Sequence, residues 1–130
     1  MKKLNIKVLI AEDDESTILL LKMILRNIVT EVFVAKNGRE AVEMLHQQPD
    51  IQLVLMDIMM PEMNGFEATR NIREQNNDVV IIAQTALTSS YYRDLAKKAG
   101  CNSYLNKPIS RLTLVELIQD YFNNNHIHCN

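Results

Sequence analysis

The sequence is poor in the residues that mark secreted, disulfide-rich or membrane-spanning chains. Its 130 residues include two cysteines, three glycines, three prolines and no tryptophan. Cys101 and Cys129 stand apart and form no CxxC pair, so no disulfide framework is indicated. No apolar run approaches the roughly 20 residues that cross a bilayer, and no signal peptide is recognisable. We therefore expect a cytoplasmic location and no membrane contact within this chain.

Charge of neither sign dominates. Fourteen lysines and arginines stand against sixteen aspartates and glutamates, a formal charge of −2, which does not favour direct nucleic acid binding. The length suits one domain with a real core. We expect this domain to span residues 1–124, with a polar tail at 125–130. His126, His128 and Cys129 are interpreted as part of that tail, not as a transition-metal site.

Strand-like and helical patterns alternate along the chain. Five runs have strand length and most are rich in Val, Ile and Leu: about Ile6–Ala11, Val32–Ala35, Ile51–Met56, Val79–Ala83 and Ser103–Leu105. The stretches between them have helical periodicity. The first carries one apolar stripe, formed by Ile18, Leu21, Leu25 and Ile28.

Capping signals mark the ends of several predicted helices. Asn37–Glu40 and Asn64–Glu67 have the spacing of a capping box. The fourth helix, about Ser89–Ala99, ends at Gly100, a suitable C-cap, and the last helix follows Ser110. Five βα units with right-handed crossovers predict an α/β fold with a parallel sheet covered on both faces.

Polar residues of complementary types follow four of the predicted strands. Asp57 closes the apolar run IQLVLMD, directly before the loop IMMPEMNG. The other strand ends, in KVLIAEDD, VVIIAQT and SYLNK, carry Glu12, Asp13 and Asp14, then Thr85, then Lys107. Since the carboxyl ends of parallel strands meet at one edge of a sheet, these groups are expected to converge. Together they suit a divalent cation and a phosphoryl group.

Each of these signals has a plain structural interpretation when taken alone. The acids suit a helix N-terminus, where the macrodipole favours negative charge. A strand-end Asp57 can cap a turn, and a lone Lys107 is usually a solvated charge. Lys107 precedes Pro108, which favours an extended backbone and permits a cis bond. The combination, with each group after its own strand, favours a functional site.

The motifs KVLIAEDDE, LVLMDIMMPEMNGFEATRNIR, IIAQTA and SYLNKP resemble those of the receiver domain of two-component response regulators. The resemblance covers about Lys3 to Phe122, and the sequences of these motifs are most similar to those of receiver domains in hybrid sensor histidine kinases. It implies a flavodoxin-like (CheY-like), doubly wound, five-stranded parallel sheet of order 2-1-3-4-5 with five helices. The active site would lie at the carboxyl ends of the strands.

The resemblance also implies roles for individual residues. Asp57 would be the phospho-acceptor, which takes a phosphoryl group from a phosphohistidine on a histidine kinase or phosphotransfer domain. Mg²⁺ would be bound by Asp13, Asp57 and the backbone carbonyl of Met59, with Glu12 acting through water. Spacing alone leaves Asp14 as an alternative to either of the other two acids. Such a domain assists its own phosphorylation and is not expected to be an enzyme with a separate substrate.

Further positions carry the expected output. Thr85 would move to the phosphoryl group and Tyr104 would rotate inward, so that phosphorylation shifts a conformational equilibrium. Lys107→Ala is expected to spare folding while it uncouples phosphorylation from this change. The readout surface would be the fourth helix, fifth strand and fifth helix, where a homodimer could form, around Tyr91, Tyr92, Arg93, Lys97 and Arg111. The resemblance also implies that Met59 and Leu87 would border the path of the attacking water, and because both are apolar we expect slow hydrolysis.

Other classes fit less well. A phosphatase of the haloacid dehalogenase type needs a second Asp two residues after the nucleophile, where this chain has Met59. A nucleotide or flavin carrier needs a Gly- or Ser/Thr-rich loop after the first strand, where acids would repel phosphate. A receiver-like interaction module that no longer depends on phosphorylation remains the alternative. Spectral changes on addition of Mg²⁺ would distinguish a functional site from one that has lost its activity.

Overall fold

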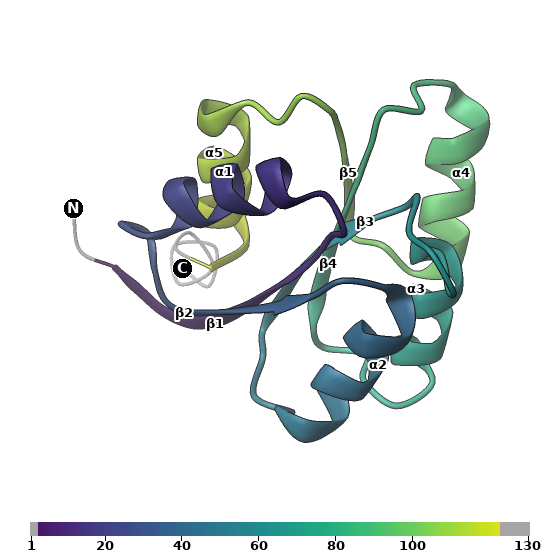
Figure 1. The fold of residues 1–130 in the computed structure, drawn as a ribbon, viewed down its shortest axis with the longest axis horizontal. Helices are drawn as coiled ribbons and strands as arrows, with labels where there is room; N and C mark the ends of the chain where they lie inside the picture. The colour runs from purple at the N-terminus through teal and green to yellow at the C-terminus, as the bar shows by residue number, and fades with distance from the viewer. Residues whose placement is uncertain (1–2, 123–130) are drawn as a thin grey trace, which may run out of the picture.

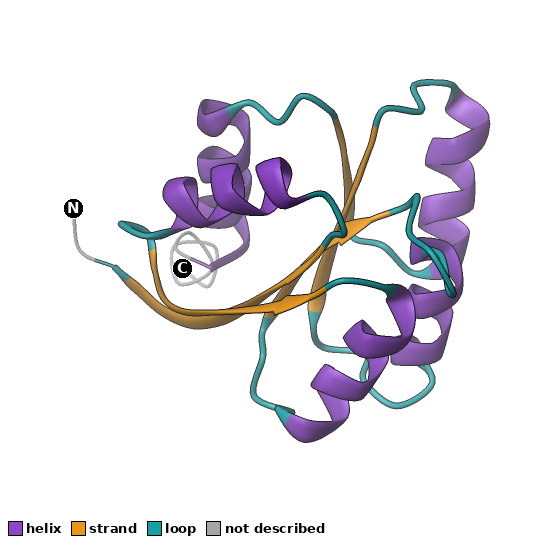
Figure 2. Ribbon diagram, in the orientation of Figure 1, coloured by secondary structure: helices purple, strands orange, loops and turns teal. Residues whose placement is uncertain are grey.

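Five strands and five helices alternate along the described part of the chain (Figure 1 and Figure 2). The computed structural model describes residues 3–122, so the predicted tail at 125–130, with His126, His128 and Cys129, lies outside the described residues. The elements are β1 (Leu4–Ala11), α1 (Glu15–Leu25), β2 (Val29–Ala35), α2 (Gly38–Gln47), β3 (Leu53–Asp57), α3 (Gly65–Arg73), β4 (Val80–Thr85), α4 (Ser90–Ala99), β5 (Ser103–Asn106) and α5 (Arg111–Phe122). Every strand pair is parallel and the order is β2-β1-β3-β4-β5, which confirms the predicted fold.

Helices cover both faces of the sheet: α1 and α5 lie on one, and α2, α3 and α4 lie on the other (Figure 1). The alternation of side chains along a strand produces this division. In β3, Leu53 and Leu55 pack in the cluster beneath α1 and α5, whereas Val54 and Met56 pack beneath α2 and α3. All five residues of β3 are buried, which is why this central strand is an uninterrupted apolar run.

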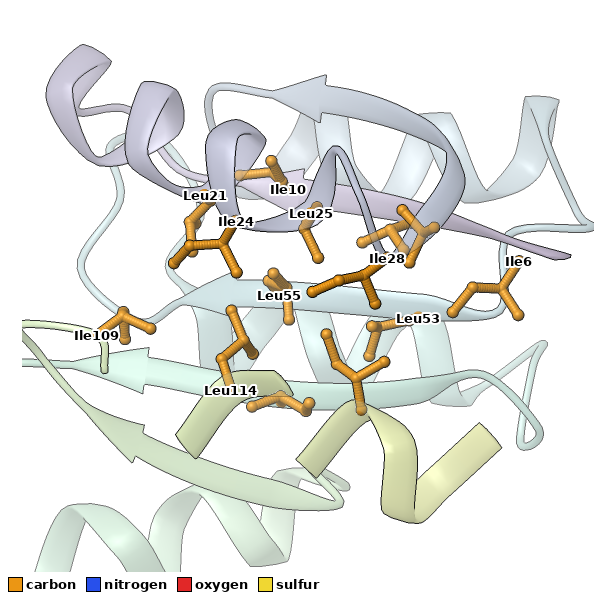
Figure 3. Close-up of a cluster of buried hydrophobic side chains, with 14 of the residues drawn as sticks. Ile6, Ile10, Leu21, Ile24, Leu25, Ile28, Leu53, Leu55, Ile109 and Leu114 are labelled. Atoms are coloured by element: carbon orange, nitrogen blue, oxygen red, sulfur yellow. The ribbon is translucent and has the colours of Figure 1, made fainter. Parts of the chain in front are cut away.

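The core beneath α1 and α5 leads up to the carboxyl edge of the sheet (Figure 3). Leu21 and Leu25 of α1 and Leu114 of α5 are completely buried against the strands. Each such side chain contributes about 1.5–3 kcal/mol through the apolar surface it removes from water. The strand ends therefore project from a rigid platform. No helix within residues 3–122 combines the length and the apolar character that crossing a bilayer requires.

The first predicted helix ends earlier than its stripe suggested. Ile28 is only 4% exposed and packs in the same core, but it does so from a turn, where its N–H donates to the Leu25 carbonyl at 2.9 Å. Strand β2 starts directly after it, at Val29, earlier than the predicted Val32. The polar Thr30 and Glu31 interrupt the apolar pattern from which the strand was predicted, so its first residues were missed. They are tolerated because β2 is an edge strand and both positions are exposed.

The predicted caps are present. Asn37 and Asn64 cap α2 and α3, each accepting the N–H of the glutamate three residues on, at 2.8 and 3.0 Å. The Glu40 carboxylate returns a bond to the N–H of Lys36, one residue before the cap residue itself. Gly100 closes α4 with a φ of 115°, in the left-handed region that glycine adopts readily.

Two glycines fix the loop that follows Asp57. The N–H of Gly38, at the start of α2, donates to the Met63 carbonyl at 3.0 Å, and a Cβ there would lie 2.1 Å from the same oxygen. The N–H of Gly65 donates to the Ile58 carbonyl at 3.0 Å, and its Cβ would lie 2.4 Å from the Asp57 carbonyl oxygen. No other residue permits these approaches. The backbone beside Asp57 is thereby held against α2.

Candidate functional site

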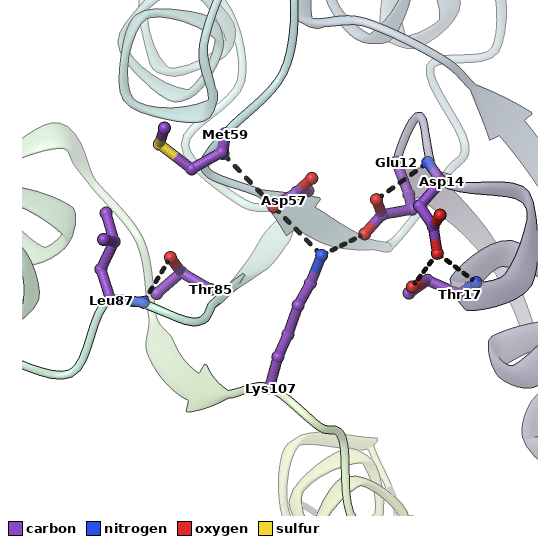
Figure 4. Close-up of polar contacts among 8 residues, drawn as sticks. All are labelled: Glu12, Asp14, Thr17, Asp57, Met59, Thr85, Leu87 and Lys107. Carbon is purple, nitrogen blue, oxygen red and sulfur yellow. Dashed lines mark hydrogen bonds and ion pairs between the residues drawn. The ribbon is translucent and has the colours of Figure 1, made fainter.

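Charged groups from three strand ends meet at the carboxyl edge of the sheet (Figure 4). Lys107 Nζ, beyond the end of β5, lies 2.8 Å from Glu12 Oε1 and 3.4 Å from Asp57 Oδ1. Glu12 follows β1 and is 1% exposed, and Asp57 ends β3 and is 4% exposed. A cis peptide bond joins Lys107 to Pro108, as the sequence permitted. Lys107 and Glu12, 95 positions apart in the chain, thus join Asp57 in one partly buried ion-pair network.

The three consecutive acids after β1 make different contacts in the structure. Carboxylate oxygens of Glu12, Asp13 and Asp57 lie within 4.8 Å of one another, and Glu12 and Asp57 are buried. Asp14 instead caps α1: its carboxylate accepts the hydroxyl of Thr17 at 2.7 Å and the N–H of Thr17 at 2.9 Å. These bonds, the hydroxyl bond above all, lower the pKa of Asp14. An all-oxygen donor set with few carboxylates suits Mg²⁺, so the first two acids fit the ion with Asp57.

Burial and neighbouring charge shift the ionisation of the central groups. Desolvation raises the pKa of Asp57 from 3.8 to about 6, and the negative charge of Glu12 adds to this shift, while Lys107 and the N–H of Met59 oppose it. Burial alone would lower the pKa of Lys107, but its hydrogen bond to Glu12 and the charge of Asp57 raise it overall. The lysine is therefore a permanent cation, and the Asp57 carboxylate carries an unfavourable charge at neutral pH.

We expect Asp57→Asn to stabilise the metal-free domain at neutral pH. Because the folded-state pKa of Asp57 is about 6 against 3.8, the folded state binds more protons than the unfolded state between those values. The stability contributed by this group therefore falls as the pH rises through that window and stays low above it. The gain should be on the order of 3 kcal/mol at about pH 7.5 and become small near pH 4. Urea unfolding of both proteins in EDTA across this range measures it; a gain that does not depend on pH would contradict the explanation.

The two predicted switch residues contact the same backbone unit, at Leu87. The hydroxyl of Thr85 is buried and accepts the N–H of Leu87 at 3.0 Å (Figure 4). The hydroxyl of Tyr104 donates to the carbonyl of Leu87, and the guanidinium of Arg93 lies 5.5 Å from the centre of the Tyr104 ring. A movement of Thr85 that breaks its bond to Leu87 therefore acts directly on the group that holds Tyr104.

The remaining predicted site residue is Met59. Its N–H donates to Asp57 Oδ1 at 3.3 Å (Figure 4), and the residue is 64% exposed. Sequence reasoning missed Gln84, which is buried directly before Thr85 on β4. The signal was available, since Gln84 is the one amide in the apolar run VVIIAQT. It also missed that the backbone of Leu87, and not only its side chain, belongs to the site.

Fold and site together define a class: a doubly wound α/β domain that presents a strand-end aspartate to a lysine and to two further carboxylates at the carboxyl edge of its sheet. The family model described as the response regulator receiver domain matches residues 8–119. The chain belongs to this family, the receiver domains of two-component response regulators.

Comparisons with individual proteins agree with this family assignment. The chain is 36% identical over 118 residues to the chemotaxis protein CheY of Halobacterium salinarum, covering 88% of this chain and 94% of that protein. Its structure resembles the receiver domain of the response regulator Ssk1 of Saccharomyces cerevisiae, solved with the histidine phosphotransfer protein Ypd1. That match has a TM-score of 0.83 and 31% identity, and covers 94% of this chain and 92% of that one. It also resembles the receiver domain of a sensor histidine kinase of Pseudomonas aeruginosa that has a magnesium ion coordinated in its active-site cleft. There the TM-score is 0.82 and the identity 32%, with 92% and 98% covered.

Some relatives are longer than this chain. It is 36% identical over 115 residues to a probable transcriptional regulatory protein of a Picosynechococcus species, but covers only 46% of that protein. It covers 48% of a probable two-component response regulator with a GGDEF domain, at a TM-score of 0.82 and 30% identity. The receiver domain is thus what these proteins share with this chain.

Proposed function

We propose that this domain accepts a phosphoryl group on Asp57 from the phosphohistidine of a histidine kinase or phosphotransfer domain, in the cytoplasm, and signals through protein contacts. The observation that carries the proposal is the buried Asp57 carboxylate, with the Lys107 ammonium at 3.4 Å and the Glu12 and Asp13 oxygens beside it. The structure of a receiver domain with a histidine phosphotransfer protein supports the class of partner. The domain would assist its own phosphorylation and turn over no separate substrate.

The chemistry follows from the charges. An oxygen of Asp57 attacks the phosphorus, the P–N bond to the donor imidazole breaks, and the freed nitrogen keeps the electron pair. Such transfers depend on positioning and charge neutralisation more than on acid/base work. The Lys107 ammonium, held by Glu12, lies where it can offset charge on the phosphoryl oxygens. Bound at Asp13, Asp57, the Met59 carbonyl and, through water, Glu12, Mg²⁺ would supply further positive charge.

The output in this proposal is a population shift. The Thr85 hydroxyl leaves the N–H of Leu87 and donates to the phosphoryl group, which alters the backbone that now binds the Tyr104 hydroxyl. Tyr104 then rotates inward, and the surface of α4, β5 and α5 changes. Pairing of two domains through this surface is a further part of the proposal. Attachment to a hybrid sensor kinase is another part, and similarity to the receiver domain of a sensor histidine kinase supports it.

The test is mass spectrometry of the protein after incubation with acetyl phosphate. We expect the added mass of one phosphoryl group, dependent on Mg²⁺ and mapped to the peptide that contains Asp57. An interaction module that no longer depends on phosphorylation would gain no mass and would show no Mg²⁺-dependent spectral change. Either of those results would replace the proposal with that alternative.

The outer face of α1 is the part of the surface that we expect the phosphodonor to cover. Three of its apolar side chains are exposed, Leu19 at 61%, Leu20 at 42% and Met23 at 52%, on the helix that begins directly after the acidic residues. The double variant Leu19→Gln, Met23→Gln should accept phosphoryl groups at least about tenfold more slowly from a phosphorylated histidine phosphotransfer domain, as expected when an apolar contact of that size is lost.

Transfer from acetyl phosphate provides the internal control for that variant. The small donor needs no protein contact, so its rate should match that of the wild type. Tyr91→Gln, at an equally exposed position on α4, should leave both rates unchanged. Equal slowing with both donors would mean that the variant damages the site itself, and an unchanged protein-donor rate would exclude α1 from the contact.

We expect the phosphorylated domain to lose its phosphoryl group slowly, with a half-life of many minutes. Leu87 has no side-chain hydrogen-bonding group and the Met59 thioether is only a weak acceptor, so neither side chain can orient an attacking water. Decay of the added mass in Mg²⁺ after removal of acetyl phosphate measures the half-life. Met59→Asn should shorten it several-fold, because an amide supplies the missing donor and acceptor. A wild-type half-life of seconds would refute the expectation.

A further inference from the structure

Gln84 is a buried amide that the resting structure leaves without a hydrogen-bond partner. It is 1% exposed, and neither Nε2 nor Oε1 bonds to any group within residues 3–122. Its backbone carbonyl is used, accepting the N–H of Ile58 at 3.1 Å. A buried polar group left unpaired is unfavourable, so native structures rarely keep one without a reason.

The sheet register places this side chain beside the phospho-acceptor. Leu55 of β3 pairs with Ile82 of β4, and both side chains pack beneath α1 and α5. Two residues further along each strand, Asp57 pairs with Gln84, so both side chains belong to that same face. Neighbouring strands lie about 4.8 Å apart, which puts an amide within reach of the adjacent carboxylate. On its other side Gln84 pairs with Leu105, which offers no hydrogen bond.

Phosphorylation would change the balance of donors and acceptors at this point. In the resting site the Asp57 carboxylate forms an ion pair with the Lys107 ammonium and accepts the N–H of Met59. Lys107 also forms an ion pair with Glu12. A phosphoryl group adds three strong acceptor oxygens and draws Lys107 toward itself. The unused donor on the adjacent strand is Nε2 of Gln84.

We propose that Gln84 is a positioning residue of the site, whose amide donates a hydrogen bond to the side-chain carbonyl oxygen of phosphorylated Asp57. This inference rests on the proposed function of Asp57. The bond holds the acyl phosphate in one orientation and favours the phosphorylated conformation, because the amide is unpaired in the resting one. Gln84 also precedes Thr85 on β4, so the bond couples the acceptor to the strand end that moves.

The test compares Gln84→Met with the wild type in binding of fluoroberyllate, a phosphoryl mimic, in the presence of Mg²⁺. Methionine keeps the length of the side chain and removes both polar atoms. Loss of one hydrogen bond to a charged centre should weaken the affinity about tenfold. Leu55→Met, a matched exchange on the same face of β3, should leave the affinity within twofold of the wild type. An unchanged affinity of Gln84→Met overturns the inference, and is the result expected if an internal water already satisfies the amide.

A second measurement does not depend on how the variant folds. In ¹H–¹⁵N spectra of the wild type, one side-chain amide proton of Gln84 should move downfield when fluoroberyllate binds, as a new hydrogen bond requires; signals that stay in place overturn the inference. Failure of the proposed function would look different. In that case the wild type itself would not bind fluoroberyllate, or Asp57→Asn would bind it equally well.

Discussion

Asp57→Asn is expected to abolish phosphoryl uptake. The amide oxygen of asparagine is a far weaker nucleophile than a carboxylate, and the substitution also removes one ligand from the acidic group. Loss of a nucleophile typically costs at least about 1,000-fold in rate, so no added mass should appear within the time that fully phosphorylates the wild type. The measurement is mass spectrometry after acetyl phosphate and Mg²⁺, followed by peptide mapping.

The matched control for this prediction is Asp14→Asn. It makes the same chemical change next to the site, and asparagine caps a helix as well as aspartate does, so α1 should keep its start at Glu15 and its capping bond from the N–H of Thr17. Uptake by this variant should remain close to that of the wild type. A phosphoryl group found on Asp57→Asn would show that another residue is the acceptor. Loss of uptake in Asp14→Asn would show that Asp14 takes part in the site and does not only cap α1.

The fold was predictable because its signals are local and repeated. A buried central strand such as Leu53–Asp57 cannot avoid being apolar, and helix caps such as Asn37 and Asn64 are short-range contacts. The errors occurred where tertiary context overrides pattern. Ile28 continues the apolar stripe of α1 in the sequence, but in the structure it enters the core from a turn. An apolar side chain can pack in this core from a helix or from a turn, so the sequence pattern does not distinguish the two.

The site was predictable in its composition but not in its detail. That Asp57 and Lys107 would meet follows from parallel strands sharing one edge. Which of the three acids turns inward depends on the rotation of the chain at the start of α1, and spacing carries no information on that; the structure resolves it through the capping bonds of Asp14. The contacts to the backbone of Leu87 were equally hidden, because any residue type supplies a backbone N–H and carbonyl.

Lys107→Ala is expected to destabilise the metal-free domain strongly, which changes the sequence-based expectation that it spares folding. Without the ammonium, the carboxylates of Glu12 and Asp57 remain buried side by side with no compensating charge. Removing one partner of a buried pair costs about 3–5 kcal/mol, and the 24% exposure of Lys107 reduces this to roughly 2–4 kcal/mol. Urea unfolding in EDTA at about pH 7.5 measures the loss.

The dependence of this loss on pH and Mg²⁺ identifies its origin. Removal of the lysine raises the pKa of Asp57 above its already elevated value, so protonation relieves the repulsion and the loss should shrink as the pH falls toward 5. Mg²⁺ should also reduce it, because a cation bound to the folded state replaces the missing charge. Lys36→Ala removes a comparable but exposed pair with Glu15 and should change stability little at any pH. A loss in Lys107→Ala that ignores both pH and Mg²⁺ would show that the lysine acts through its packing, and the electrostatic account of the site would fail.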